Sequence, residues 1–286
     1  MRRTVRPANA ALRCGTSSPS GSATVLEVTG LRRCFGNVQA VDDVSFIVRQ
    51  GGSLGIVGES GSGKTTTARI VAGLERSDAG HVLVHGRDRA DRRERRRDAR
   101  LARAREVQMV FQDPFLSLDP RITVGKVLRE TLRLHFPGTD HTSRIAELLA
   151  QVGLGTREES ALPRQLSGGQ RQRAAIARAL AVEPAALVLD EAVAALDVSV
   201  QAQILNLLAD IRERTGIAYL FITHDLGVVR CVTDDVLVMR HGRIVESGRT
   251  EQVLADPRHP YTRLLMDSVP RPGWDPRRIS AARRAL

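Results

Sequence analysis

The stretch "GESGSGKT", from Gly58 to Thr65, constrains the fold of this chain more than any other feature. It fits the pattern G-x-x-x-x-G-K-[ST] and lies between "SLGIVG", typical of a buried strand, and "TTTARIVAGL", typical of a helix. Glycines let successive backbone N–H groups curl around phosphate oxygens, and the start of the helix adds its positive end. The motif therefore predicts an α/β fold with a strand, a phosphate-binding loop and a helix that together bind a nucleoside triphosphate.

Each residue of this phosphate-binding loop is a candidate ligand of the nucleotide. Lys64 places a positive charge beside the β- and γ-phosphates, and the Thr65 hydroxyl suits Mg²⁺. A Gly-rich turn without a ligand is the alternative, and the flanking strand and helix disfavour it. The predicted nucleotide-binding residues are Gly58, Glu59, Ser60, Gly61, Ser62, Gly63, Lys64, Thr65 and Thr66.

A phosphate site also needs a group that holds the metal and a base that activates water, and "LVLDE" supplies both. Asp190 follows four apolar residues, the pattern of a buried parallel strand whose carboxyl end reaches a site. Its carboxylate suits Mg²⁺, and Glu191 beside it suits the general base. Adjacent acids also occur at turns and helix N-termini, which is the alternative for this pair taken alone.

The rest of the chain alternates short apolar runs with amphipathic helical patterns. Between residues 113 and 180 the spacing is mainly helical, as in "VGKVLRETLRLH" and "SRIAELLAQVGL". Strand-like runs are "HVLVHGRD", "VQMVFQD", "AALVLDE" and "AYLFITHD", and "DVLVMRHGRIVESG" is typical of a hairpin. This order predicts a parallel sheet with a helical subdomain.

The net charge of +11 raises the question of nucleic-acid binding. Residues 1–24, 87–105 and 271–286 carry +4, +6 and +4, which leaves the rest of the chain at about −3. The folded body is therefore not basic. We interpret the basic segments as solvated tails, disordered over 1–24, and one charged excursion, with contact to anionic lipid as the alternative.

The sequence argues against a membrane span and against a cysteine-based site. It has no run of 18 apolar residues, so any membrane role is expected to be peripheral. Cys14, Cys34 and Cys231 are too few and too scattered for a disulfide framework or a zinc cluster. A reducing compartment fits this cysteine usage best.

Five motifs occur in an order that resembles the nucleotide-binding subunits of ABC transporters, over about residues 25–270. They are "GESGSGKT", "FQDPFLSLDP", "LSGGQRQR", "LDEAVAALD" and "FITHD". The resemblance implies a P-loop NTPase (ABC ATPase) core with a parallel sheet, an antiparallel β subdomain and a helical subdomain at about 113–180. It divides the chain into a basic tail at 1–24, an ABC ATPase domain at 25–255 and an extension at 256–286.

The resemblance also implies why "LSGGQRQR" places glycines where a helix begins, although glycine destabilises a helix by about 1 kcal/mol relative to alanine. In the family two ATPase subunits pack head to tail, and the signature loop of one caps the ATP held by the other. Ser167, Gly168, Gly169 and Gln170 would offer N–H groups and a hydroxyl to the γ-phosphate. We expect side chains at the glycines to hold the partner off. Ser167 as an ordinary helix cap is the alternative.

Further roles are carried over by position from the family. Gln112 resembles the residue that senses Mg²⁺ and the attacking water, and His224 the one that contacts the γ-phosphate and positions Glu191. Asp197 matches the loop that reaches the opposite subunit. Phe35 lies where the family places an aromatic ring under the adenine, with a core role as the alternative.

The sequence departs from the common family pattern after Glu191. Ala192 stands where proline is frequent, and Ala194 where serine is frequent. Neither change removes a phosphate or metal ligand. We therefore expect an active ATPase with altered communication between subunits.

The segment "DPRHPYTRLLMDSVPRP" resembles the oligopeptide, dipeptide and nickel importer branch of the family. The branch implies two integral-membrane permeases, a second ATPase subunit that is the same or homologous, and indirectly an extracytoplasmic solute-binding protein. The chain would bind ATP and Mg²⁺ and lie peripherally at the cytoplasmic face of the membrane, with Phe115 and Leu116 facing the permease. No nucleic acid is expected.

Two other functions fit the sequence less well than the importer subunit does. A soluble ABC ATPase acting on nucleic acid or the ribosome is the main alternative, and only the basic stretch 87–105 favours it. A kinase or GTPase with a phosphate-binding loop would leave "LSGGQ" and His224 without a role.

Overall fold

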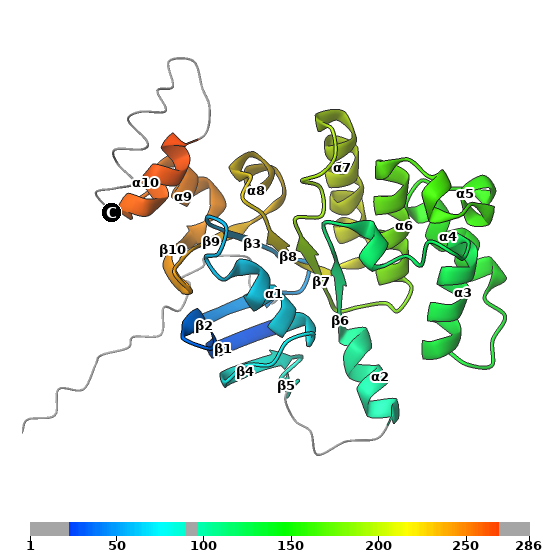
Figure 1. Cartoon of the computed structure of the whole chain (residues 1–286), viewed down its shortest axis with the longest axis horizontal. Coiled ribbons are helices and arrows are strands. Elements are labelled where there is room, and N and C mark those ends of the chain that lie inside the picture. Colours follow the sequence, from blue (N-terminus) through cyan, green and yellow to red (C-terminus); the bar gives the residue numbers. More distant parts are fainter. Residues whose placement is uncertain (1–22, 90–96, 269–286) are drawn as a thin grey trace, which may run out of the picture.

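The computed structural model describes residues 23–89 and 97–268. Its centre is a six-stranded sheet in the order β10-β9-β3-β8-β7-β6 (Figure 1). Neighbours from β9 to β6 run parallel, and β10 runs antiparallel to β9. The strands are β3 (Ser53–Val57), β6 (Val107–Val110), β7 (Ala186–Asp190), β8 (Ala218–Ile222), β9 (Asp235–Arg240) and β10 (Arg243–Arg249). β3, β7 and β8 are buried along their whole length, as their continuous apolar runs predict.

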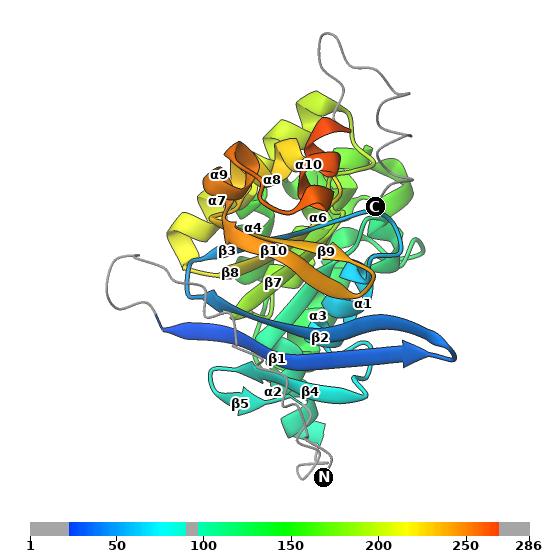
Figure 2. The same ribbon diagram turned by 90° about the vertical axis from the view of Figure 1, so that its left-hand side faces the viewer.

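A four-stranded antiparallel sheet in the order β2-β1-β4-β5 forms a separate layer (Figure 2). In β2, alternate residues Val44, Phe46 and Val48 are buried, so this sheet presents one apolar face. That face shares an apolar cluster with helix α1 (Lys64–Ala72) and with the central sheet. The strands are β1 (Thr24–Phe35), β2 (Val38–Arg49), β4 (Ala79–Val84) and β5 (Arg87–Asp88).

Helices cover the β6 and β7 end of the central sheet, and Figure 1 shows α3 to α6 gathered there. Their apolar faces form one cluster that continues onto Leu187 and Leu189 of β7, so the helical lobe shares its core with the sheet. The predicted fold class is confirmed: a parallel-sheet core with an antiparallel β subdomain and a helical subdomain. The elements are η1 (Pro114–Leu116), α3 (Val124–His135), α4 (Thr142–Gln151), α5 (Thr156–Ser160), η2 (Pro163–Gln165), α6 (Gly168–Leu180) and α7 (Val198–Thr215).

Three further helices lie at the opposite end of the sheet, near β9 and β10. They are α8 (Leu226–Val232), α9 (Thr250–Ala255) and α10 (Pro260–Asp267). Tyr261 and Leu264 of α10 share a buried apolar cluster with Val57 of β3 and Val238 of β9. The predicted boundary after residue 255 stays a prediction, and the helix beyond it packs directly on the central sheet.

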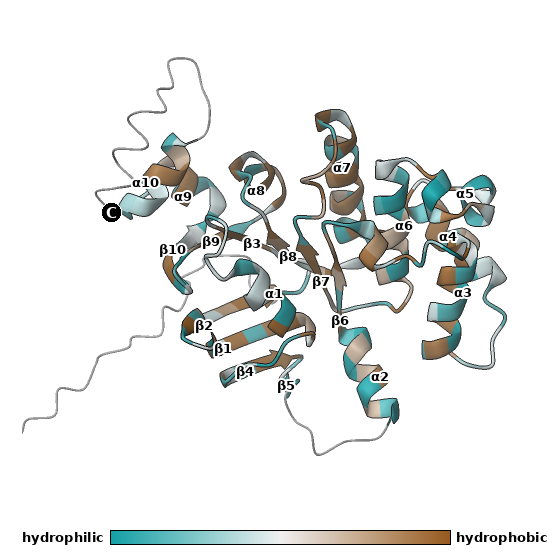
Figure 3. Ribbon diagram, viewed as in Figure 1, coloured by the Kyte–Doolittle hydropathy of each residue, from teal (hydrophilic) through white to brown (hydrophobic). Residues whose placement is uncertain are grey.

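Helix α2 (Arg97–Glu106) buries no residue, and Figure 3 colours it mainly as hydrophilic. This agrees with a solvated charged excursion. Arg89 does not: its side chain is 9% exposed, it pairs with Glu106 at 3.3 Å, and it donates to the Arg103 carbonyl oxygen at 3.0 Å. The charged stretch 87–105 is therefore not solvated at Arg89, because this arginine joins the end of the antiparallel sheet to α2.

Two expectations concern membranes and cysteines. Within residues 23–89 and 97–268, no helix is both long and apolar enough to cross a bilayer. Cys34 and Cys231 are free and exposed. Cys14 and nearly all of the predicted tail at 1–24 lie outside the described residues.

Candidate functional site

The carboxyl edge of the parallel sheet brings the predicted catalytic residues together. β3 leads into the phosphate-binding loop, β6 leads to Gln112, β7 ends at Asp190 and Glu191, and β8 leads to His224. Carboxyl ends of parallel strands lie at one edge of a sheet, which is where ligands bind in open α/β folds. The order of strands therefore assembles groups that are far apart in the sequence.

Two glycines of the phosphate-binding loop are fixed by neighbouring backbone. Gly58 has φ 153°, and a Cβ atom there would lie 2.2 Å from the carbonyl oxygen of Met239. Gly63, which begins α1, has φ 102°, and its Cβ would lie 2.2 Å from the carbonyl oxygen of Ala40. No other residue type fits these positions. The loop is thus held between β2 and the end of β9.

Lys64 is buried inside the phosphate-binding loop and bonds to its backbone. Its Nζ donates to the carbonyl oxygens of Gly58 at 2.7 Å and Glu59 at 2.8 Å. Burial lowers the pKa of this ammonium, and the nearby Glu191 and Asp190 carboxylates partly offset that effect. A buried cation held by carbonyl dipoles is only partly compensated, so an anion such as a phosphate would be stabilised beside it.

Thr65 and Asp190 form an oxygen pair next to this cation. The Thr65 Oγ1 donates to the Asp190 Oδ1 at 3.3 Å. Burial raises the pKa of Asp190, the Thr65 hydrogen bond lowers it, and the Glu191 charge raises it further, with a net upward shift. Hydroxyl and carboxylate oxygens suit a hard divalent cation, and a cation would offset the cost of burying the negative charge. These residues therefore fit Mg²⁺.

Glu191 and His224 form a second pair on the more exposed side of the edge. The His224 Nδ1 lies 3.0 Å from the Glu191 Oε1, and the two side chains are 61% and 25% exposed. Glu191 has φ 48°, a left-handed conformation unusual for a non-glycine residue, and its N–H donates to the Ile222 carbonyl oxygen at 2.8 Å. Such strain is typical of functional sites. A water molecule can reach this carboxylate.

The signature loop, Ser167 to Gln170, begins helix α6. The Ser167 Oγ accepts from the Gln170 N–H at 3.2 Å, and the Gln170 Oε1 accepts from the Ser167 N–H at 2.9 Å. This reciprocal pair is a capping box, so the helix-cap role weighed for Ser167 is present. The first N–H groups of a helix have no partner within it, which leaves those of Gly168 and Gly169 suited to an anion.

The two signature glycines have different surroundings. Gly169 is buried, and a Cβ atom there would lie 2.5 Å from the Val200 Cγ1 of α7. Gly168 is half-buried, and its Cβ would lie 3.4 Å from the Leu196 Cδ2. Packing within this chain therefore already disfavours a side chain at Gly169, and the expectation that the glycines admit a partner stays a prediction.

Asp197 caps α7 beside the signature loop. Its Oδ1 accepts from the Val200 N–H at 2.9 Å and from the Ser199 hydroxyl at 2.7 Å. Asp197 and the neighbouring Val198 are exposed, Val198 at 83%. Because Gly169 packs on Val200, the starts of α6 and α7 lie side by side and present two capped helix ends to solvent.

Two further predicted residues are exposed. Gln112 is exposed just beyond β6. Phe35 is 45% exposed at the end of β1, with the Arg33 guanidinium 4.6 Å from its ring centroid. The core role weighed for Phe35 is therefore wrong, and stacking on adenine stays a prediction.

A contact from α10 to the phosphate-binding loop was not predicted from the sequence. The Tyr261 Oη accepts a hydrogen bond from the Glu59 N–H at 3.0 Å, 202 residues away in the chain. The letters "HPYT" marked the segment as a feature of the importer branch, but no spacing in the sequence places it beside the loop.

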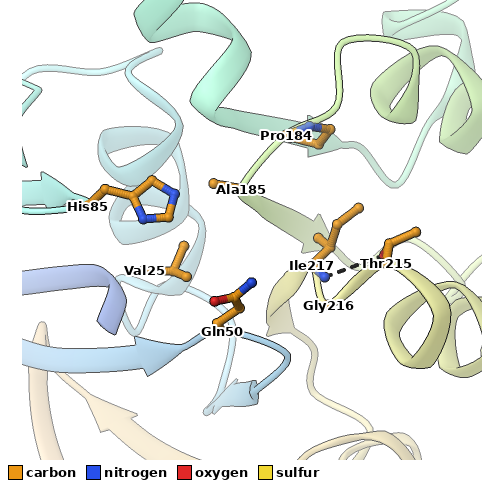
Figure 4. Close-up of a pocket in the computed structure, with 8 residues that line it drawn as sticks. All are labelled: Val25, Gln50, His85, Pro184, Ala185, Thr215, Gly216 and Ile217. Carbon is orange, nitrogen blue, oxygen red and sulfur yellow. Dashed lines mark hydrogen bonds between the residues drawn. The ribbon is translucent and has the colours of Figure 1, made fainter. Parts of the chain in front are cut away.

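A small hollow of about 110 Å³ lies elsewhere in the molecule (Figure 4). Ala185 and Ile217 precede β7 and β8, so the hollow is at the amino ends of the parallel strands, away from the phosphate-binding loop. None of the predicted site residues lines it, and we do not assign it a ligand. Its lining residues are Val25, Gln50, His85, Pro184, Ala185, Thr215, Gly216 and Ile217.

Two protein-family models match the chain. One, described as ABC transporter, covers residues 41–194. The other, described as the C-terminal region of oligopeptide/dipeptide transporters, covers residues 245–285 and includes α10. The first match contains the phosphate-binding loop, the signature loop and Glu191, and the second contains Tyr261.

Curated relatives and a solved structure agree with these matches. The oligopeptide transport ATP-binding protein OppF of Bacillus subtilis is 42% identical over 258 residues, 88% of this chain and 84% of that protein. OppD of Mycobacterium bovis is 48% identical over 254 residues, and the chain spans 40% of its length. A solved ATP-binding cassette, described as dimeric and in a post-hydrolysis state with ADP and Pi, has a TM-score of 0.68 and 27% identity, covering 79% of this chain and 98% of that one.

Proposed function

The chain belongs to the ABC transporter family, and from this premise we propose that it binds and hydrolyses ATP in an importer of peptides or related small solutes. The observation that carries the hydrolytic part is the Glu191 and His224 pair, which lies at the same sheet edge as Lys64. The peptide class is supported by the C-terminal family match and by relatives named for peptide and glutathione import. No comparison supports the alternative of an ATPase acting on nucleic acid.

Phosphate binding is assigned to the loop and to Lys64. Backbone N–H groups at the start of α1 and the Lys64 ammonium would hold the β- and γ-phosphates. Thr65 and Asp190 would hold Mg²⁺, with Gln112 as a third contact, and the metal when bound would polarise the phosphoryl oxygens.

Proton transfer is assigned to Glu191. Its carboxylate, oriented on one side by the His224 ring at 3.0 Å, would accept a proton from the attacking water. The backbone bond from the Glu191 N–H to the Ile222 carbonyl oxygen holds the left-handed conformation of Glu191 just after β7. His224 would position the Glu191 carboxylate. It would also donate a hydrogen bond to the γ-phosphate, in addition to Lys64.

The signature loop and Asp197 would complete the ATP site of a second ATPase subunit, either another copy or a homologue. The contacts of this loop within the chain come from α7 and from the helical lobe through Glu158. Ser167 and the Asp197 cap are exposed and Gly168 is half-buried, which suits an arriving γ-phosphate. Phe35 would stack on the adenine of the nucleotide held by its own chain.

Membrane permeases would bind at the exposed turn that follows Gln112. Phe115 and Leu116 are 39% and 67% exposed, and the Arg171 guanidinium lies 4.9 Å from the Phe115 ring centroid. An exposed apolar pair next to a proposed nucleotide contact suits a partner that must respond to the nucleotide. The chain would lie peripherally at the cytoplasmic face of the membrane, with an extracytoplasmic binding protein as an indirect partner.

The test is mass spectrometry of proteins that co-purify with the tagged chain from its own membranes in mild detergent. We expect two permeases and an ATPase subunit. A Phe115→Ser, Leu116→Ser variant should lose the permeases and keep its ATPase activity, while an Ile47→Ser variant, also at an exposed apolar position, should keep both. Recovery of ribosomes or DNA in place of permeases would contradict the importer.

A further inference from the structure

The C-terminal helix α10 reaches the phosphate-binding loop through one side chain. The Tyr261 Oη accepts from the Glu59 N–H at 3.0 Å. The tyrosine is 2% exposed, it belongs to the apolar cluster that contains Val57 and Val238, and the Arg240 guanidinium lies 5.0 Å from its ring centroid. Packing of the ring therefore holds the hydroxyl in place independently of the hydrogen bond.

The peptide group that bonds to Tyr261 carries a second hydrogen bond on its other side. The Glu59 N–H and the Gly58 carbonyl belong to one planar trans unit, so they point in opposite directions. The Gly58 oxygen accepts from the Lys64 Nζ at 2.7 Å. Tyr261 and Lys64 thus hold opposite ends of one rigid group, and the ammonium at the carbonyl polarises the N–H that bonds to Tyr261.

This peptide group needs such partners because it follows a glycine. Gly58 has φ 153°, a conformation that side-chain-bearing residues rarely adopt, and glycine itself imposes little preference. The orientation of the peptide group must therefore come from its hydrogen bonds. If Lys64 turned from the Gly58 oxygen to a bound phosphate, the hydrogen bond to Tyr261 would still hold the Gly58–Glu59 peptide group.

Helix α10 is docked by contacts that do not involve the Tyr261 hydroxyl. The Glu246 carboxylate of β10 accepts from the N–H groups of Arg258 at 2.7 Å and His259 at 3.1 Å. The His259 Nδ1 accepts from the Tyr261 N–H at 3.1 Å and caps the helix. Removing the hydroxyl alone should therefore leave the helix in place.

We propose that Tyr261 is a positioning residue for the phosphate-binding loop: its hydroxyl orients the Gly58–Glu59 peptide and, through it, Lys64. The C-terminal segment then sets the affinity of the ATPase core for ATP, although it contributes no group that touches the nucleotide. The inference rests on the proposed binding of ATP by this loop. Its structural part, protection of the Glu59 N–H by Tyr261, does not depend on ATP.

The chain contains a matched control, because its two tyrosines have similar surroundings. Tyr219 is also 2% exposed, and its hydroxyl donates to the Leu208 carbonyl oxygen at 2.9 Å, in a contact between β8 and α7. Tyr261→Phe and Tyr219→Phe each remove one buried hydroxyl that bonds to backbone. Only the first removes a contact of the phosphate-binding loop.

The first measurement is amide hydrogen exchange at Glu59 by NMR, in the full chain without nucleotide. We expect a protected amide in the unaltered chain and in Tyr219→Phe, and loss of protection in Tyr261→Phe. Rapid exchange in the unaltered chain would overturn the proposal whether or not either variant folds.

The second measurement is the Kd for MgATP, with the thermal midpoint recorded for each variant. Tyr261→Phe should weaken binding about tenfold, which is the order expected for one lost hydrogen bond. Tyr219→Phe should bind as the unaltered chain does while showing a similar thermal midpoint to Tyr261→Phe. Unchanged affinity in Tyr261→Phe would overturn the proposal, and so would an equal loss of affinity in both variants. Failure of the unaltered chain to bind MgATP would instead contradict the proposed function. The hydrogen-exchange result, which needs no nucleotide, would still test the contact between Tyr261 and Glu59.

Discussion

The phosphate-binding loop and the signature loop both use the first turn of a helix, but their surroundings differ. Gly58, Gly63 and Lys64 are buried against neighbouring backbone of the same chain. In the signature loop Ser167 is exposed, Gly168 half-buried and Gly169 buried, so the start of the loop opens to solvent. The phosphate-binding loop, although exposed at Ser60 and Gly61, is therefore enclosed at both ends by its own chain, and the signature loop faces outward at Ser167, as a site shared between two chains requires.

The largest expected effect removes hydrolysis while leaving both loops intact. Glu191→Gln keeps the shape of the side chain but removes the base, so kcat for ATP should fall by a factor of about 10²–10⁴. MgATP should still bind and should drive dimerisation, measured by light scattering. Glu183→Gln is the control, since Glu183 has the same left-handed backbone, φ 55° against 48°, and lies on the surface. Hydrolysis by Glu191→Gln at the rate of the unaltered chain would contradict the assigned base.

The next effect separates the two signature glycines. Gly169→Ala places a Cβ 2.5 Å from the Val200 Cγ1, so it should lower the free energy of unfolding by about 1–3 kcal/mol. Val200→Ala in the same chain should restore part of that loss, measured as a double-mutant cycle in urea.

Gly168→Ala should behave in the opposite way. Its Cβ would lie 3.4 Å from the Leu196 Cδ2, an ordinary contact distance, so stability should be unchanged or slightly raised while ATP-dependent dimerisation falls. If Gly168→Ala lost as much stability as Gly169→Ala, the outward-facing role of Gly168 would be wrong.

A smaller effect tests whether Phe35 belongs to the enclosed site. Loss of a stacked ring weakens nucleotide binding by about 1–3 kcal/mol. Phe35→Ala should therefore weaken ATP binding roughly tenfold and leave inorganic tripolyphosphate binding unchanged. Phe115→Ala, at a similarly exposed ring, is the control. Equal weakening for both ligands would show that Phe35 acts on the loop and not on the base.

The smallest effect is one of stability. Burial raises the pKa of Asp190, so its carboxyl favours the folded state at low pH and loses that contribution as pH rises through the raised pKa. Asp190→Asn should therefore raise the thermal midpoint of the nucleotide-free protein by a few degrees at neutral pH, and the gain should shrink as pH falls. Thr65→Val is the companion variant, since it removes the 3.3 Å bond without removing the charge. A lower midpoint for Asp190→Asn at neutral pH would contradict this effect.

Much of the fold follows from local patterns. The runs that became β3, β7 and β8 are apolar along their length, and only a sheet covered on both faces buries such strands. Asp190 and Glu191 could be predicted because their types suit phosphate chemistry and they follow a strand, whereas the role of His224 came from the family resemblance alone.

Contacts between distant segments could not be predicted in this way. Gly169 was predicted only to face a partner subunit, but its neighbour Val200 lies in another helix of this chain. Arg89 looked like one charge among many in a basic stretch, and its burial depends on Glu106 across a turn. Tyr261 accepts a hydrogen bond from the Glu59 N–H, which is 202 residues away in the chain. In each case the partner is set by the packing of elements, which no local spacing encodes.

The central claim is that the enclosed loop of one chain and the outward loop of another form one ATP site, and complementation tests it most directly. Lys64→Ala disables the first loop. Gly168→Asp disables the second, because a carboxylate at a helix start is compatible with folding but repels phosphate. Each variant alone should hydrolyse ATP far more slowly than the unaltered chain. Mixed, they should recover activity, since one of the two shared sites then has both loops intact. A mixture that forms dimers but stays as inactive as its separate components would contradict the shared site.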